Sequence, residues 1–536
     1  MLQLRESAPL EITSSERNEG VVDMALLDDV LIENDFQLRF QERGTIMEIA
    51  RFGVIFSVLV GCGSDPVAPS SADAETETAT SDTGSLADTA VEVATDTGTS
   101  DAPSETTPSL EPRLSVVKLS ETTNDRFFGV TYDKTGNIFA TGVVGEGAGA
   151  DTDLAFVVAK FKPTGELDKS FGTNGFSKKN VIAKKSGEVA RGIVVQSTGK
   201  IVIAGTVEHE GATPLVDDRD RDVALVRFNA DGTLDTSFGT AGVVILDLGA
   251  GELVGTTYVA DSQWGLNLLE GDDLLVTCAA KAMGRTDTDW ALVKLKSDGK
   301  KDNSFGTAGV ATVDIDNTSA NARTSSVLAD GSIVSAGYFK DKDSVTRPVL
   351  FKLKPNGTLD TSFGINGIWS EAILPLVAEA YGAALQGTSF VTVGYGRGSM
   401  TESVDWLSMR VTGAGAWDKT YGAMGVARID VAMQNDNGRA VAILPDDRVL
   451  MVGGARPTAT TIDGMVAILS KDGKPDTSWG AGGYRLFDIG GPNDFFWAAA
   501  ISPMKDNAVV VGLKGALADG TAGNDDAALL MIPLGK

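Results

Sequence analysis

Short apolar runs separated by Gly, Asp and Asn recur from Arg113 to the end of the chain. Many are rich in β-branched residues, as in "GVVILDL" (242–248), "GKIVIAG" (199–205) and "DVALVRFNADG" (222–232). Runs of this length and composition, bounded by turn residues, predict short antiparallel strands joined in a meander. Four such runs fall in each repeat of the pattern, so we expect repeating four-stranded units.

Two stretches lack strong strand character, "EAILPLVAEAYGAALQ" (371–386) and "FFWAAAISPM" (495–504). Local propensity leaves a helix open at both places. Their position within the repeat predicts a loop followed by a strand, and we give the repeat precedence over the local signal.

A nine-residue motif marks each repeat and fixes its length. Its successive Asp residues lie 67, 67, 58, 58 and 58 residues apart. The six copies are "LDKSFGTNG" (167–175), "LDTSFGTAG" (234–242), "KDNSFGTAG" (301–309), "LDTSFGING" (359–367), "WDKTYGAMG" (417–425) and "PDTSWGAGG" (475–483).

Six repeats end in the motif, and a seventh at 495–534 follows without one. We assign "RLSVVKL" (113–119) as the first strand of the first repeat and "YRLFDI" (484–489) as the first strand of the last. Seven four-stranded units fit a ring in which each unit buries both faces against its neighbours. The predicted fold is therefore an all-β, seven-bladed β-propeller, with six and eight blades as alternatives.

The motif, together with the "DGKIVVAG"-like and "DxALxR"-like runs after it, resembles the delta-60 repeat family over residues 113–536. The resemblance implies a β-propeller-like repeat protein of the bacterial surface or of secreted proteins. It implies no shared catalytic residues, because the family has no established common activity.

The motif residues suit a structural role. The Asp and the Ser or Thr two residues later can tie a turn, the aromatic can insert between blades, and the glycines permit positive φ. A repeated metal ligand or catalytic acid is the alternative for the Asp. A second Asp begins the fourth run of most repeats, where a turn cap is favoured over a ring of cation ligands; these residues are Asp222, Asp289, Asp405, Asp463 and Asp526.

Meander geometry places the motif and the turn between the second and third runs on one face. The other face carries loops of variable length and sequence, which is typical of a binding face. These loops include 143–153, 206–222, 249–262 and 515–526. The acidic "DDRDRD" (217–222) could hold Ca²⁺, but no EF-hand spacing occurs, and a solvated loop is favoured.

The N-terminal part of the chain resembles a bacterial lipoprotein precursor. Residues 47–61 combine Arg51 with a nine-residue apolar run, and "LVGC" (59–62) resembles a lipobox, which makes Cys62 the expected site of lipid attachment. A buried strand with a free thiol is the alternative. Residues 62–112 are rich in Ser, Thr, Ala and acids and contain neither Lys nor Arg before Arg113, so we expect a disordered tether. Residues 1–46 are then either a misassigned start or an acidic extension.

The net charge of −27 and the pI near 4.4 argue against nucleic-acid binding. The single histidine, His209, and the absence of a CxxC pair argue against a transition-metal site. Cys278 stands where other repeats have Gly, so we expect a small buried residue. Trp264, Trp290 and Trp406 are assigned to packing between blades, with an aromatic ligand surface as the alternative.

No catalytic residue, metal site or cofactor site is predicted, and the chain is not expected to be an enzyme. We expect a monomeric binding module, anchored by lipid to the bacterial outer membrane and facing the periplasm or the cell surface. Its partner would be an envelope protein or a glycan. An envelope-assembly scaffold and a propeller enzyme acting on glycans are the alternatives.

Overall fold

The computed structural model describes residues 41–42, 45–46, 111–146, 153–183, 187–210, 219–254, 257–516 and 524–534. The chain divides into two compact units, Met1–Val60 and Gly61–Lys536. In the first unit the described residues pair as β1 (Gln41–Glu42) and β2 (Thr45–Ile46). The predicted signal peptide at 47–61, the lipid site Cys62 and the tether as far as residue 110 lie outside the described residues.

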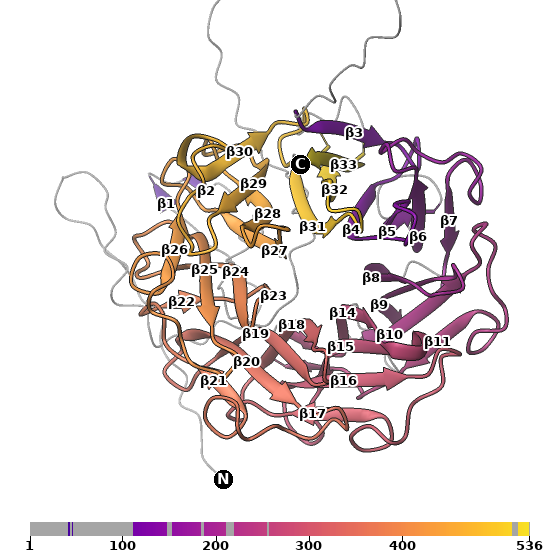
Figure 1. Ribbon diagram of the computed structural model, residues 1–536, viewed down its shortest axis with the longest axis horizontal. Coiled ribbons are helices and arrows are strands. Elements are labelled where there is room, and N and C mark those ends of the chain that lie inside the picture. Colours follow the sequence, from indigo (N-terminus) through magenta and orange to yellow (C-terminus); the bar gives the residue numbers. More distant parts are fainter. Residues whose placement is uncertain are drawn as a thin grey trace, which may run out of the picture. The chain divides into compact units, whose positions relative to one another are not determined.

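The second unit contains a β-propeller of seven four-stranded blades around a central axis (Figure 1), as the sequence predicts. The blades, each given from its innermost to its outermost strand, have the following bounds. Blade 1 comprises β4 (Asp125–Tyr132), β5 (Ile138–Gly145), β6 (Leu154–Phe161) and β7 (Phe176–Lys179). Blade 2 comprises β8 (Val189–Val195), β9 (Ile201–Glu210), β10 (Arg219–Phe228) and β11 (Val243–Leu246). Blade 3 comprises β14 (Ser262–Leu268), β15 (Leu274–Lys281), β16 (Thr288–Leu295) and β17 (Val310–Val313).

The other four blades follow the same order. Blade 4 comprises β18 (Ala320–Val327), β19 (Ile333–Lys340), β20 (Thr346–Leu353) and β21 (Ile368–Ser370). Blade 5 comprises β23 (Gly382–Gln386), β24 (Ser389–Arg397), β25 (Asp405–Val411) and β26 (Val426–Ile429). Blade 6 comprises β27 (Asn437–Ile443), β28 (Val449–Ala455), β29 (Asp463–Leu469) and β30 (Tyr484–Phe487). Blade 7 comprises β31 (Phe495–Ile501), β32 (Asn507–Lys514), β33 (Asp526–Pro533) and β3 (Arg113–Val117).

The ring closes through strands from both ends of the propeller. The innermost strands contact one another in chain order, and β31 of blade 7 contacts β4 of blade 1. The outermost strand of blade 7 is β3, which pairs antiparallel with β33, with Arg113 opposite Met531 and Val117 opposite Ala527. The first strand and the last are thereby held in one sheet, so that opening the ring requires breaking a strand pair.

The structure corrects the grouping of strands expected from the sequence. The run after each motif is the outermost strand of the blade before it, as β7 is of blade 1, and the run at 113–119 belongs to blade 7. The blade count is unaffected, because every repeat is shifted by the same single strand. The two stretches with helical propensity contain β23 and β31, as their position in the repeat predicts.

Apolar cores lie between neighbouring blades. The second and third strands of each blade are sandwiched and mostly buried on both faces; all eight residues of β5 and of β15 are buried. Strands covered on two sides are expected to be apolar throughout, which explains runs such as "LLVTCAAK" (274–281).

Two additions interrupt the regular pattern. β22 (Val377–Ala378) links blades 4 and 5, and the hairpin of β12 (Glu252–Val254) and β13 (Thr257–Val259) lies between blades 2 and 3. Within the described part of the chain, no helix combines the length and apolar character needed to cross a membrane.

Candidate functional site

The repeated motif is structural. It forms the turn between the third and fourth strands of blades 1 to 6, and in all six copies one oxygen of the Asp accepts bonds from the Ser or Thr two residues later. In blade 2, Ser237 N and Oγ lie 3.1 and 2.7 Å from Asp235 Oδ1. The next aromatic is buried between two blades in five copies and half-buried at Trp479. The turn and wedge roles predicted for the motif are confirmed.

The second oxygen of each motif Asp contacts a basic side chain, which the sequence analysis missed. Five of these bases stand eight residues before the Asp, on the third strand; they are Lys160, Arg227, Lys294, Lys352 and Arg410. In blade 6 this position is apolar, and Arg448, just before β28, contacts Asp476 at 2.8 Å instead. A Lys or Arg eight residues before the motif Asp recurs in five repeats, and this constant spacing is the sequence signal that could have predicted these ion pairs.

The Asp that begins the third strand does not form a ring of ligands. In two blades it pairs with an Arg, Asp289 with Arg285 and Asp405 with Arg428. Among the described residues, the acids able to surround one cation are Asp222, Asp247 and Asp261, whose ligand atoms lie within 4.8 Å of one another. Asp261 is already engaged, since it accepts bonds from three backbone amides.

A buried acid holds the loop before the innermost strand in five blades. The five are Asp125, Glu188, Asp261, Asp436 and Asp494. Each accepts backbone N–H bonds; Glu188, for example, accepts from Val181 and Ile182 at 2.9 and 2.5 Å. Burial raises the pKa of Glu188 to about 7, in spite of these bonds. These acids anchor the loops around the axis.

A ring of seven side chains lies around the axis. Each stands three residues after the position that the buried acid occupies in five of the blades. In six blades it is the extra residue of a β-bulge in the innermost strand, and in blade 5 it directly precedes β23. A bulge redirects its side chain out of the regular strand alternation. Aromatic residues and arginines alternate from blade to blade, and we call the set the axial ring: Phe128, Arg191, Trp264, Arg323, Tyr381, Arg439 and Trp497.

Each arginine of the axial ring stacks between the two aromatics of its neighbours. The distances from Cζ to the ring centroids are 5.8 and 4.6 Å at Arg191, 3.6 and 4.3 Å at Arg323, and 4.1 and 4.8 Å at Arg439. Phe128 and Trp497 complete the circle, with centroids 5.1 Å apart. All seven blades therefore contribute to one continuous stack of cation–π and aromatic contacts.

Further polar and aromatic groups surround the ring on the side of blades 4 and 5. Arg323 Nη2 donates to Tyr338 Oη at 2.8 Å, and Tyr381 packs against Tyr338 and Tyr395. Burial, and then the nearby charge of Glu379, raise the pKa of Tyr395 well above its usual value. Glu379 and Arg439 thus both lie close enough to Tyr395 to shift its pKa, Glu379 raising it and Arg439 lowering it.

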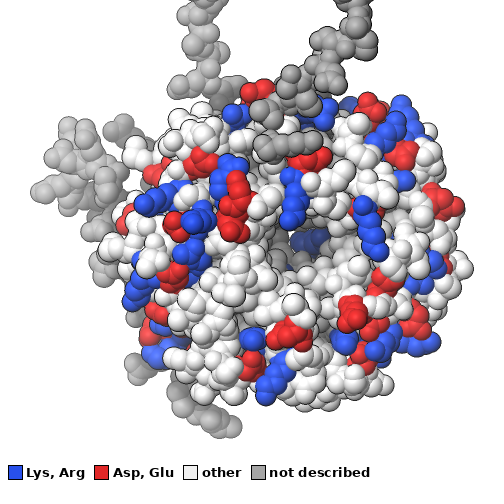
Figure 2. Space-filling view, in the orientation of Figure 1, with Lys and Arg blue, Asp and Glu red and all other residues white. Residues whose placement is uncertain are grey.

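The axial ring borders a channel of about 250 Å³. Arg191 and Trp264 line it, together with small and apolar residues from all seven innermost strands, among them Gly192, Gly382 and Ala440. Figure 2 shows a hollow at the centre of the propeller with basic side chains inside it. The sequence analysis did not find this site. The packing between blades predicted for three tryptophans is confirmed for Trp290 and Trp406, which are buried, and Trp264 stacks between the arginines of blades 2 and 4.

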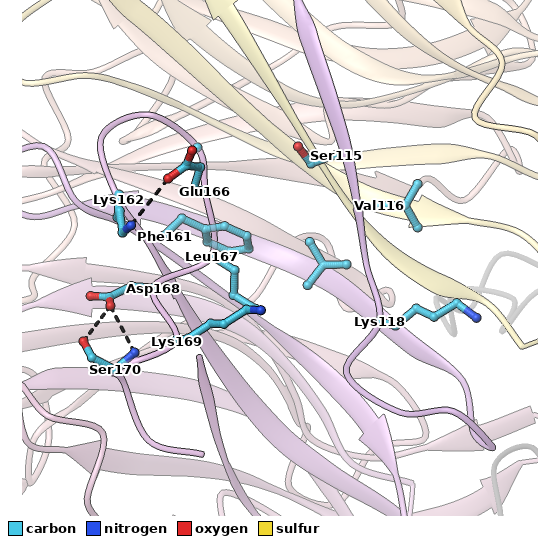
Figure 3. Close-up of a pocket in the computed structure, with 12 residues that line it drawn as sticks. Ser115, Val116, Lys118, Phe161, Lys162, Glu166, Leu167, Asp168, Lys169 and Ser170 are labelled. Atoms are coloured by element: carbon cyan, nitrogen blue, oxygen red, sulfur yellow. Dashed lines mark hydrogen bonds and ion pairs between the residues drawn. The ribbon is translucent and has the colours of Figure 1, made fainter. Parts of the chain in front are cut away.

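A larger cavity, of about 680 Å³, lies on the outside where blade 7 meets blade 1 (Figure 3). At other junctions the preceding motif fills this place; Gly299 and Gly357 lie against Phe238 and Phe305. β3 reaches blade 7 without a motif turn before it, so no motif aromatic fills the seventh junction. Beside the cavity, Lys162 pairs with Glu166 and Ser170 donates to Asp168. The missing motif aromatic gives the cavity a structural explanation.

The remaining predicted residues fall as follows. Cys278 is a buried thiol whose pKa is raised by burial and then by Asp261, as expected for a packing residue. His209 lies in β9, but its side chain is outside the described residues. Much of the variable loops, including 211–218 and 517–523, is likewise outside the described part.

Two segments of the chain match a known family. They are residues 196–238 and 328–363, and the family is described as "Domain of unknown function (DUF5122) beta-propeller". The segments span the second and third strands and the motif of blades 2 and 4. The chain carries β-propeller repeats. The delta-60 name stays a prediction.

The solved structures that this chain matches have little sequence in common with it. A protein of unknown function from Dyadobacter fermentans is 13% identical, with TM-score 0.42, over 79% of this chain and 99% of the other. The Hadza microbial sialidase Hz136 is 12% identical, with TM-score 0.38, over 62% of this chain and 63% of the other. An α-L-arabinanase from Penicillium chrysogenum is 12% identical, with TM-score 0.36, over 64% and 92%. No curated protein matches the sequence. At these levels the similarities assign no activity.

Proposed function

We propose that this protein is a binding module of the bacterial cell envelope that recognises its ligand at the central channel. The observation that carries the proposal is the axial ring, in which seven blades each place one side chain at a common point. The repeated motif offers no comparable site, because its polar atoms are used in turns and ion pairs.

The position of the axial ring supports a role for the loops of the variable face. Six ring residues come early in their innermost strands and Tyr381 directly precedes its strand, so each lies shortly after the loop that leads into that strand from this face. A ligand approaching from there would pass the variable loops before it reached the channel. The loops would then select ligands, and the channel would hold the part common to them.

The proposed location depends on Cys62. A lipid on this cysteine, followed by the acidic tether, would hold the propeller at the outer membrane. Labelling cells with radioactive palmitate should mark the wild-type protein and not the Cys62→Ala variant. Equal labelling of the two would remove the lipoprotein proposal and leave the binding site untouched.

Binding itself is tested with the full chain, extracted in detergent, on an array of bacterial and plant glycans and against purified envelope components. We expect retention of a ligand class without conversion, followed by mass spectrometry of the bound material. Release of a cleaved product, with no stable complex, would instead establish the alternative of a propeller enzyme acting on glycans.

A further inference from the structure

In five junctions between blades, the motif of one blade docks onto a turn of the next. The glycine after the motif aromatic donates its backbone N–H to a carbonyl in the turn that follows the third strand of the next blade, as Gly239 does to Asp298 at 3.2 Å. The other four pairs are Gly172–Asp231, Gly306–Asn356, Gly364–Ala414 and Gly422–Asp472, at 2.8–2.9 Å. The junction between blades 7 and 1 has no motif to make this contact.

Blade 1 nevertheless carries the receiving turn. Gly165 has φ +83°, as its counterpart Gly299 in blade 3 has φ +91°. Thr164 corresponds to Asp298 of blade 3, but within the described part of the chain no backbone amide donates to its carbonyl oxygen. The turn of blade 1 therefore presents an acceptor that the other turns use to hold a motif.

Met531 takes part of the space that the motif aromatics fill elsewhere. A Cβ on Gly165 would lie 2.8 Å from Met531 Cγ, whereas a Cβ on Gly299 would lie 2.9 Å from the ring of Phe238. Met531 stands on β33 at the position of Arg227 on β10, the base that pairs with the motif Asp of blade 2. Because Met is unbranched and has three rotatable bonds, its side chain can move aside for a larger group.

The space that remains is the cavity of about 680 Å³ between β3 and the turn of blade 1 (Figure 3). Phe161 and Leu167 supply apolar wall from blade 1. Ser115 lines the other side from β3 and is exposed, although the residues at the same position of three other outermost strands are buried. These are Ala311, Trp369 and Ala427, which are 4, 4 and 7% exposed. The seventh junction is thus incomplete on both sides of the cavity.

We propose that this junction cavity binds a surface turn of another protein, in which an aromatic residue is followed by glycine. The aromatic side chain takes the place of a motif Phe beside Gly165, and the glycine N–H donates to the carbonyl of Thr164. The aromatics of this chain's own motifs are packed in their junctions, and residues 63–112, which precede β3, contain no aromatic residue. The site is separate from the central channel and goes beyond the function proposed above.

The test uses the full-length protein, extracted in detergent, and a fluorescently labelled peptide with the sequence of residues 234–242, "LDTSFGTAG". Fluorescence anisotropy measures the binding of this parent peptide and of the same peptide carrying Phe238→Ala. We expect saturable binding of the parent peptide and about tenfold or more weaker binding of the altered one, because most of the apolar burial comes from the aromatic side chain.

A variant that fills the cavity should abolish peptide binding. Ser115→Trp places on β3 the residue that blade 4 has at the corresponding position, Trp369. Thr312→Trp is the matched control, because Thr312 is exposed on β17, the outermost strand of blade 3. It should leave the peptide affinity unchanged. Circular dichroism and unfolding temperatures check that both variants are folded.

A second variant should increase binding. Met531→Arg restores the base that stands at this position in blade 2, where Arg227 pairs with Asp235. It should raise the affinity for the parent peptide about tenfold, as expected for a charge-assisted contact. It should leave the affinity for the peptide carrying Asp235→Asn unchanged, whereas a mere change in packing would affect both peptides alike.

The outcomes separate this site from the channel. Failure of the parent peptide to bind, equal binding of the Phe238→Ala peptide, or binding unaffected by Ser115→Trp in a folded protein would overturn the proposal. Dimerisation of the protein that is lost in Ser115→Trp would make a second copy the occupant and overturn the assignment to another protein. Should Ser115→Trp not fold, the peptide pair and Met531→Arg decide. Glycan retention by Ser115→Trp should equal that of the wild type, so either proposal can fail while the other stands.

Discussion

The rings of Phe128 and Trp497, from the first and the last blade of the propeller, contact each other at 5.1 Å between centroids and at 69° between planes. This is the one place in the axial ring where two aromatics are neighbours. Seven positions cannot alternate perfectly between two kinds of residue, so one like pair is unavoidable. It falls where the ring closes, and an aromatic pair tolerates contact that two guanidinium groups would resist by charge repulsion.

The axial ring should also stabilise the fold. Arg323 is 2% exposed and stacks on Trp264 and Tyr381, so Arg323→Met should lower the free energy of unfolding by about 1–3 kcal/mol. Lys419→Met is the control, because Lys419 lies over Trp417 on the exposed surface, where the same kind of contact is worth about 0.5–1 kcal/mol. Urea unfolding of both variants measures the difference. Equal losses would show that the stack adds nothing beyond an ordinary surface contact.

Closure of the propeller should depend on the contact between Arg126 and Asp525. Arg126 Nε lies 2.6 Å from Asp525 Oδ2, and each side chain is only 11% exposed. A double-mutant cycle to Ala should give a coupling of about 1–3 kcal/mol, because both charges are largely removed from water. The exposed pair Lys162–Glu166 should couple by about 0.5 kcal/mol or less. A coupling at Arg126–Asp525 no larger than at the surface pair would contradict a role in closure.

The motif Asp residues should differ in their importance. Asp235→Ala leaves Arg227 without its carboxylate, and both side chains are 8% exposed, so we expect a loss of about 3 kcal/mol or more. Asp360→Ala removes a longer contact, 3.3 Å to Lys352, between side chains 17–19% exposed, and should cost about 1–2 kcal/mol. Thermal unfolding of the two variants ranks them. The reverse order would mean that the turn, and not the ion pair, determines the contribution of the motif.

The repeat made most of the fold predictable, and the axial site needed information that no single repeat contains. Equal spacing of the motif sets the number of blades, and its Asp, Ser and aromatic have local roles that follow from turn chemistry. The phase of the repeat was not predictable, since the strand after the motif could pair on either side until β33 and β3 were seen together. The axial ring depends on a bulge that turns one residue toward the axis. Its alternation emerges only when "FFG", "ARG", "QWG", "ART", "AYG", "GRA" and "FWA" are compared as one column.

The buried acids around the axis should make the protein less stable as the pH rises from about 5 to 8. Burial raises the pKa of Glu188 to about 7, helped by the charge of Asp153 and opposed by two backbone amides and Lys179. Because the folded chain holds this proton more tightly than the unfolded chain, its contribution is complete below the ordinary pKa and is lost as the pH passes through 7. Each unit of difference in pKa is worth about 1.4 kcal/mol.

Glu188→Gln tests this directly, since Gln keeps an oxygen that accepts from the amides of Val181 and Ile182 but does not titrate. The unfolding temperature of the variant, measured from pH 5 to 8, should fall less steeply than that of the wild type. Asp360→Asn is the control, because hydrogen bonds from Ser362, together with Lys352, hold the pKa of that carboxyl below its usual value. Its contribution is lost only in acid, so its curve between pH 5 and 8 should run parallel to the wild type. A Glu188→Gln curve that is also parallel would show that Glu188 stays ionised in the folded protein, with its two amide donors outweighing the cost of burial.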